Sequence, residues 1–227
     1  MPEQFVKDLA SYRAQAVFNP WSETDPQNDR CLQAPQIRRA QLQQYLAERI
    51  GHARLLLVAE AIGYQGGHFS GIPMTSERLL LGGLKSKGIL PEHAIAGITP
   101  QRTSRAEVRR DGFTEPTATI VWGFFADNGY DPRSFVLWNA FPWHPYKPAA
   151  GLLTNRTPSE EELLDGHRIL HRMIELGRFR RIVAVGRKSA AQLAALGIPA
   201  SEVRHPANGG AGLFRRQMAE LLEGGCT

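Results

Sequence analysis

Three short runs of mainly apolar residues, each about the length of one β-strand, most constrain how this chain folds. They are Leu55–Ala59, Phe135–Ala140 and Arg181–Val185. A strand that is apolar on both faces is typical of a parallel sheet covered by helices on each side. The three runs therefore predict buried, parallel strands.

Helical patterns lie between these runs. Helices are expected over 3–14, 37–50, 75–84, 116–128, 157–176, 189–196 and 213–222, and Glu202–His205 reads as a short fourth strand. This alternation predicts an α/β fold, a three-layer α/β/α sandwich around a central, mostly parallel four-stranded sheet. The length of 227 residues fits one domain over 1–227, with 1–53 as a helical and loop extension packed on it. Loops are expected over 19–35 and, with short elements, 85–112.

Composition excludes several classes of protein. The apolar runs are shorter than the roughly 20 residues that a membrane span needs, so no membrane partner is expected. The sequence holds only two cysteines, Cys31 and Cys226, which cannot form a four-thiolate cluster. We expect no metal, no cofactor and no signal peptide, and a reducing cytoplasm as the location. The net charge of +5 permits binding to a polyanion.

Four loops at the carboxyl ends of the expected strands predict where a ligand binds. They are 60–67, 139–144, 186–189 and 205–210. In open parallel sheets, ligands bind beyond the carboxyl ends of the strands. We therefore expect these four loops, which are far apart in the sequence, to converge on one site.

Each of these loops allows more than one interpretation. The glycine-rich loop 63–73 contains neither G-x-G-x-x-G nor G-x-x-x-x-G-K-S/T, so tight turns compete with a phosphate cradle. Asn139 ends an apolar strand, where its amide either matches an imide edge such as that of uracil or bonds nearby backbone. His205, followed by Pro206, is either a structural histidine or a group that acts on a ligand.

Four segments carry a resemblance to a known family. They are Ala59-Glu-Ala-Ile-Gly63, Ser70-Gly-Ile-Pro-Met74, Phe135-Val-Leu-Trp-Asn139 and His205-Pro-Ala207. In this order, with three of them at the ends of expected strands, they resemble motifs of the uracil-DNA glycosylase superfamily, over roughly residues 54–222. The chain is similar to a bacterial branch that lacks the cysteines of the iron-sulfur members.

The resemblance implies a DNA glycosylase of base-excision repair that hydrolyses the N-glycosidic bond of uracil, with other deaminated bases as further candidates. The implied partners are DNA containing such a base and the abasic DNA product, bound by a monomer. A second interpretation is a family member that binds damaged or abasic DNA with little turnover. Ala61 favours it, because several members carry Asp or Asn there, although iron-sulfur members combine an alanine with a preceding glutamate, as Glu60 and Ala61 do.

The resemblance also assigns roles to residues. Catalytic roles fall to His205, which would donate a hydrogen bond to the base O2, and Glu60, which would orient water or stabilise the sugar cation. Base contacts are implied for Ala61, Ile62, Gly63, Tyr64, Met74 and Asn139. Met74 stands where an aromatic ring usually stacks on the base, and Gly63 where some members carry a tyrosine, unless Tyr64 covers that gap. DNA-binding roles are implied for Thr75, Ser76, Arg156, Lys188, Ser189 and Asn208, with Asn208 or Leu213 filling the space left by the flipped base.

Overall fold

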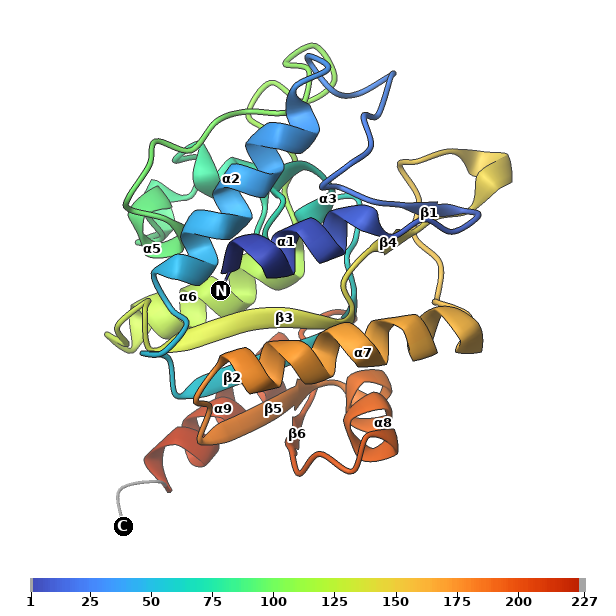
Figure 1. Cartoon of the computed structure of the whole chain (residues 1–227). Coiled ribbons are helices and arrows are strands. Elements are labelled where there is room, and N and C mark those ends of the chain that lie inside the picture. The colour runs from blue at the N-terminus through green and yellow to red at the C-terminus, as the bar shows by residue number, and fades with distance from the viewer. Residues whose placement is uncertain (1, 225–227) are drawn as a thin grey trace.

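A four-stranded parallel sheet forms the centre of the protein, seen here in a computed structural model that describes residues 2–224 (Figure 1). Cys226 lies outside the described residues. The strands are β2 (Leu55–Ala61), β3 (Phe135–Phe141), β5 (Arg181–Val185) and β6 (Ser201–Val203), in the order β3-β2-β5-β6. Every neighbouring pair is parallel. The predicted α/β sandwich is therefore confirmed.

Helices cover both faces of this sheet. On one face α6 (Pro116–Asp127) and α9 (Ala211–Glu223) meet through Phe124 and Phe214, whose ring centroids are 6.1 Å apart. On the other face α7 (Glu160–Leu176) and α8 (Arg187–Ala195) are linked by a 2.6 Å contact between His167 Nε2 and Gln192 Oε1. The connection from β2 to β3 runs one way along the sheet, and the connections from β3 to β5 and from β5 to β6 run the other way. Right-handed crossovers therefore place α6 on one face and α7 and α8 on the other.

The N-terminal helices cover the free edge of the sheet. α1 (Pro2–Ser11) contacts β3 through Phe5 and Trp138, and α2 (Ala34–Ala47) contacts it through Tyr45. The backbone N–H of Leu137 on β3 donates to the Tyr45 hydroxyl over 2.7 Å. An edge strand with open N–H groups invites pairing with other chains, so this side chain satisfies a group that the sheet leaves free.

Short elements fill the long connections. They are β1 (Val17–Phe18), α3 (Gly67–Ser70), α4 (Glu77–Leu80), η1 (Lys85–Lys87), α5 (Pro91–Ala94), β4 (His144–Pro145) and η2 (Pro148–Ala150). β1 and β4 pair antiparallel, which joins the N-terminal segment to the loop after β3. No helix among residues 2–224 is both long and apolar enough to cross a membrane.

Several predicted boundaries were wrong by a few residues. The helix expected over 75–84 stops at Leu80, and Ser76 is its cap, accepting from the N–H of Leu79 over 3.3 Å. The capping box of α7 is formed by Ser159 and Glu162, two residues later than expected, because Thr157 and Pro158 still belong to the loop. The fourth strand ends at Val203, so His205 lies in the loop beyond it.

Candidate functional site

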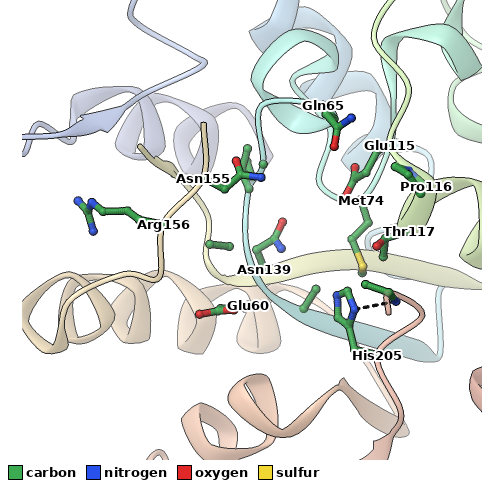
Figure 2. A pocket seen from close by; sticks show the side chains of 15 residues that line it. Glu60, Gln65, Met74, Glu115, Pro116, Thr117, Asn139, Asn155, Arg156 and His205 are labelled. Carbon is green, nitrogen blue, oxygen red and sulfur yellow. Dashed lines mark hydrogen bonds between the residues drawn. The ribbon is translucent and has the colours of Figure 1, made fainter. Parts of the chain in front are cut away.

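A cavity of 310 Å³ lies at the carboxyl ends of β2 and β3 (Figure 2). The register pairs Ala59 with Asn139, so the ends of these two strands lie side by side. The cavity is lined by Ala59, Glu60, Ala61, Ile62, Gly63, Gln65, Met74, Glu115, Pro116, Thr117, Asn139, Asn155, Arg156, His205 and Ala207. Three of the four predicted loops therefore meet there. The fourth, 186–189, lines an adjoining hollow with Glu60, His205 and Asn208.

Asn139 presents a buried amide to this cavity. The residue is 1% exposed, and its Oδ1 is buried without a hydrogen-bond partner in the structure. A buried amide oxygen without a partner costs roughly 1–3 kcal/mol, so such groups usually meet a ligand or water. The interpretation in which Asn139 bonds nearby backbone has no support from its Oδ1.

His205 is held in one tautomer by its own loop. Its Nδ1 accepts a hydrogen bond from the backbone N–H of Ala207 over 3.1 Å, drawn as the dashed line in Figure 2. Burial lowers the pKa of the imidazole, and the positive charge of Arg204 lowers it further. The neutral ring then carries its proton on Nε2. His205 is thus a neutral N–H donor at the wall of the cavity.

A glycine at the start of α8 makes room for this histidine. Gly186 has φ +94°, and a Cβ built on it would lie 2.9 Å from the Cβ of His205. An L side chain is disfavoured at this φ and has no space there. The loop after β5 thus sets the position of the residue after β6.

Met74 packs into the cavity from a strained backbone. Its φ is +46°, uncommon for a residue with a side chain, and the residue is 3% exposed. Its carbonyl accepts a hydrogen bond from Trp122 Nε1 over 3.2 Å, which helps to hold this conformation. Such strain clusters at functional sites. That Met74 stacks on a base stays a prediction.

Glu60 is paired and only partly buried. Its Oε1 contacts Lys188 Nζ at 2.9 Å, and Lys188 also donates to Thr157 Oγ1 over 2.7 Å. The ion pair brings two predicted residues together, one catalytic and one DNA-binding, between the cavity and the adjoining hollow. Glu60 therefore stands beside a cation rather than in an apolar environment.

The predicted gap at Gly63 faces Asn155, which the sequence analysis did not single out. A Cβ on Gly63 would lie 3.3 Å from Asn155 Nδ2, and the N–H of Tyr64 donates to Asn155 Oδ1 over 3.1 Å. The Tyr64 ring instead makes an edge contact with Phe113, with centroids 6.4 Å apart. Tyr64 is not among the residues that line the cavity. In this structure Asn155, not Tyr64, lies next to the gap.

Three of the predicted DNA contacts have hydroxyl groups that point inward, and those assignments need correction. Thr75, Ser76 and Ser189 are fully buried. The Thr75 and Ser189 hydroxyls donate to the carbonyls of Pro73 and Gly186, and Ser76 caps α4. These hydroxyls hold turns, so in this structure a phosphate does not reach them.

The other predicted DNA contacts lie at the surface or at the cavity rim. Lys188 and Asn208 line the adjoining hollow. Arg156 lines the cavity, but its guanidinium points away from the centre in Figure 2 and binds Glu162 at 2.5 Å. That pairing holds the loop against the start of α7.

Glu115 is the ionisable residue of the cavity that the sequence analysis missed. It lies just before α6, between an uncertain loop and an expected helix, and no motif marks it. Gln65 lies in the predicted loop 60–67 but was not singled out within it, and Asn155 was missed because no motif marks it. A weak signal existed, because Glu115 directly precedes a proline in the first turn of a helix, a place where the chain turns.

Comparisons with known proteins identify a family and a fold. A family model described as "Uracil DNA glycosylase superfamily" matches residues 49–220. Among solved structures, the chain is similar to the crystal structure of wild-type SMUG2 from Pedobacter heparinus, with a TM-score of 0.65. That match has 15% sequence identity and covers 98% of this chain and 95% of the other, so it concerns the fold. No curated protein matches the chain.

Proposed function

Because the chain belongs to the uracil DNA glycosylase superfamily, we propose that it hydrolyses the N-glycosidic bond of uracil in DNA, with other deaminated bases as further substrates. Family membership itself supports a DNA glycosylase role. The observation that carries the finer proposal is the buried amide of Asn139 with its partnerless Oδ1.

Asn139 suits the imide edge of uracil. Its Oδ1 accepts from N3–H of the base while its Nδ2 donates to O4. Cytosine presents the reverse pattern, an acceptor at N3 and a donor at N4, and would leave both groups mismatched. Buried polar groups without partners are costly, so this mismatch supplies discrimination.

His205 supports departure of the base. As the glycosidic bond breaks, its electron pair moves to the base, and negative charge grows on O2. A neutral imidazole with its proton on Nε2 is already a hydrogen-bond donor to that oxygen. The hydrogen bond strengthens as the charge develops, which is the condition for accelerating the reaction.

Glu60 acts on the positive charge that develops on the sugar. The sugar becomes positive as the base leaves, and a carboxylate at the rim stabilises that cation or orients the attacking water. Lys188 holds this carboxylate and offers its charge to a phosphate of the same strand. The water gives its hydroxyl to C1′, and its proton ends on the released base.

The assay is release of free uracil from single- and double-stranded oligonucleotides that carry one uracil. We expect release by the wild type and a loss of roughly 10²- to 10³-fold in His205→Ala, with DNA affinity little changed. Asn139→Asp should weaken uracil release and admit cytosine, because a carboxyl group accepts from the exocyclic amine. Normal single-turnover release by His205→Ala, or an unchanged base preference in Asn139→Asp, contradicts these assignments.

The alternative, a protein that binds damaged or abasic DNA with little turnover, draws on Ala61 and on the pairing of Glu60. Position 61 offers no carboxylate to activate water, and Glu60 is bound to Lys188. Retention on abasic DNA without base release would favour this alternative. A monomeric state and a cytoplasmic location remain part of the proposal.

A further inference from the structure

A second carboxyl group faces the cavity, and the mechanism above does not use it. Glu115 precedes α6, but its side chain forms no cap to that helix. Its Oε2 atom is buried and has no hydrogen-bond partner in the structure. In Figure 2 the Glu115 side chain extends from the side of the cavity opposite His205, next to Gln65. Glu115 and Asn139 thus both line one cavity, and each has a buried acceptor atom without a partner.

The loop after β2 is shaped around this carboxyl. A Cβ built on Gly66 would lie 1.9 Å from Glu115 Oε2, so no other residue type fits at position 66 without moving Glu115. Gly66 also starts α3, and its N–H donates to the carbonyl of Gly63 over 3.1 Å. The loop that carries the base-contacting residues thus packs directly against the carboxyl.

The surroundings of Glu115 favour its uncharged form. Burial raises the pKa of this carboxyl to about 7. The charged and titratable groups that line the same cavity come from β2, the loop before α7 and the loop after β6: Glu60, Arg156 and His205. Glu60 is paired with Lys188 and Arg156 with Glu162, and His205 is neutral. Of the segments next to Glu115, the loop 63–66 contains one titratable residue, Tyr64, and α6 begins with the uncharged Pro116 and Thr117.

We propose that Glu115 acts as a neutral carboxylic acid that donates a hydrogen bond to the flipped base and stabilises the negative charge of the departing base. This makes it a further catalytic residue, and the inference rests on the proposed glycosylase function. The carboxyl keeps its proton, so the balance of the hydrolysis is unchanged: the electron pair goes to the base, and water supplies hydroxyl and proton. An ionised Glu115 would repel the same charge, because the low-dielectric cavity screens it poorly.

The test is a pH series of single-turnover uracil release by the full chain, from about pH 5 to pH 9, with Glu115→Gln, Glu115→Ala and wild type. Glu92→Gln, an exposed carboxylate on α5, is the matched control. We expect wild-type release to fall above about pH 7 as the carboxyl ionises. Glu115→Gln keeps a donor of the same shape and should lose that fall, while Glu115→Ala should lose roughly 10²-fold at acidic pH.

The proposal is overturned if uracil release by Glu115→Gln falls above pH 7 as it does in wild type. It is also overturned if Glu115→Ala releases uracil as fast as wild type. Equilibrium binding to DNA with a non-hydrolysable 2′-fluoro-deoxyuridine, over the same pH range, separates this proposal from the proposed function. Absent uracil release together with binding that weakens above pH 7 only in wild type would refute the glycosylase function and leave the Glu115 contact supported. Absent release with pH-independent binding would refute both.

Discussion

Glu115→Gln should stabilise the free protein, and more so as the pH rises. Glutamine has nearly the same shape as the protonated carboxyl, so packing against Gly66 is kept. It differs in that it cannot ionise. The perturbation therefore removes the cost of a buried charge without opening a cavity, and it requires neither DNA nor activity.

The magnitude follows from the pKa of Glu115. Burial raises it from its ordinary 4.5 to about 7. The native state then holds a proton that the unfolded chain has already released, so stability falls as pH rises from about 4.5 to about 7. At about 1.4 kcal/mol for each pKa unit, the loss is about 3 kcal/mol. Above pH 7 the loss is complete, and below pH 4.5 it is absent.

The assay is urea unfolding of wild type and Glu115→Gln at intervals between about pH 4 and pH 8. The quantity to compare is the difference in unfolding free energy between the two proteins at each pH. Other groups, including the buried pair His68 and His144, are present in both proteins and cancel in that difference. We expect the variant to gain about 3 kcal/mol on wild type across this range. A difference that stays constant would refute the reasoning and show that Glu115 is solvated or paired.

Three further predictions concern the walls of the site. Gly186→Ala should lower the free energy of unfolding, measured in urea, by about 1–3 kcal/mol and slow uracil release, because the new Cβ would contact His205. An unchanged free energy of unfolding would contradict this close approach. Gly63→Tyr should displace Asn155 and raise the ratio of uracil to 5-substituted-uracil release; an unchanged ratio shows that position 63 does not face the base. Lys188→Met should weaken DNA binding and reduce the salt-dependence slope by about 1; an unaltered slope removes Lys188 from the phosphate contacts.

The fold was predictable because its signals are local. Apolar runs such as Leu55–Ala59 identify buried strands even where the bounds of the helices are uncertain. The carboxyl ends of parallel strands then indicate the edge of the sheet at which a ligand binds. Asn139 could be singled out on this basis, since it is the polar residue of an apolar strand, and His205 because it lies just beyond the short strand β6. Errors of a few residues arose where side-chain caps compete, as at Ser76 and Ser159.

Burial was not predictable, because it depends on contacts between distant segments. Thr75, Ser76 and Ser189 have residue types that suit phosphate contacts, and only the packing of α4 and α8 shows that their hydroxyls face inward. Glu115 is the converse case. Its Oε2 lies against Gly66, far away in the sequence, so no local pattern predicts that this carboxyl oxygen is buried.

The N-terminal segment supports the wall of the cavity, although the family match begins only at residue 49. Next to the cavity residue Asn155, the carbonyl of Thr154 contacts His144 Nε2 at 2.7 Å, and a carbonyl only accepts, so this nitrogen carries the proton. His144 Nδ1 is 2.9 Å from His68 Nδ1, and Phe18 stacks on His68 with ring centroids 4.1 Å apart. A line of buried contacts thus runs from β1 to the loop that carries Asn155. The segment before residue 49 helps to position that loop, and the similarity to SMUG2, which covers 98% of this chain, extends into it.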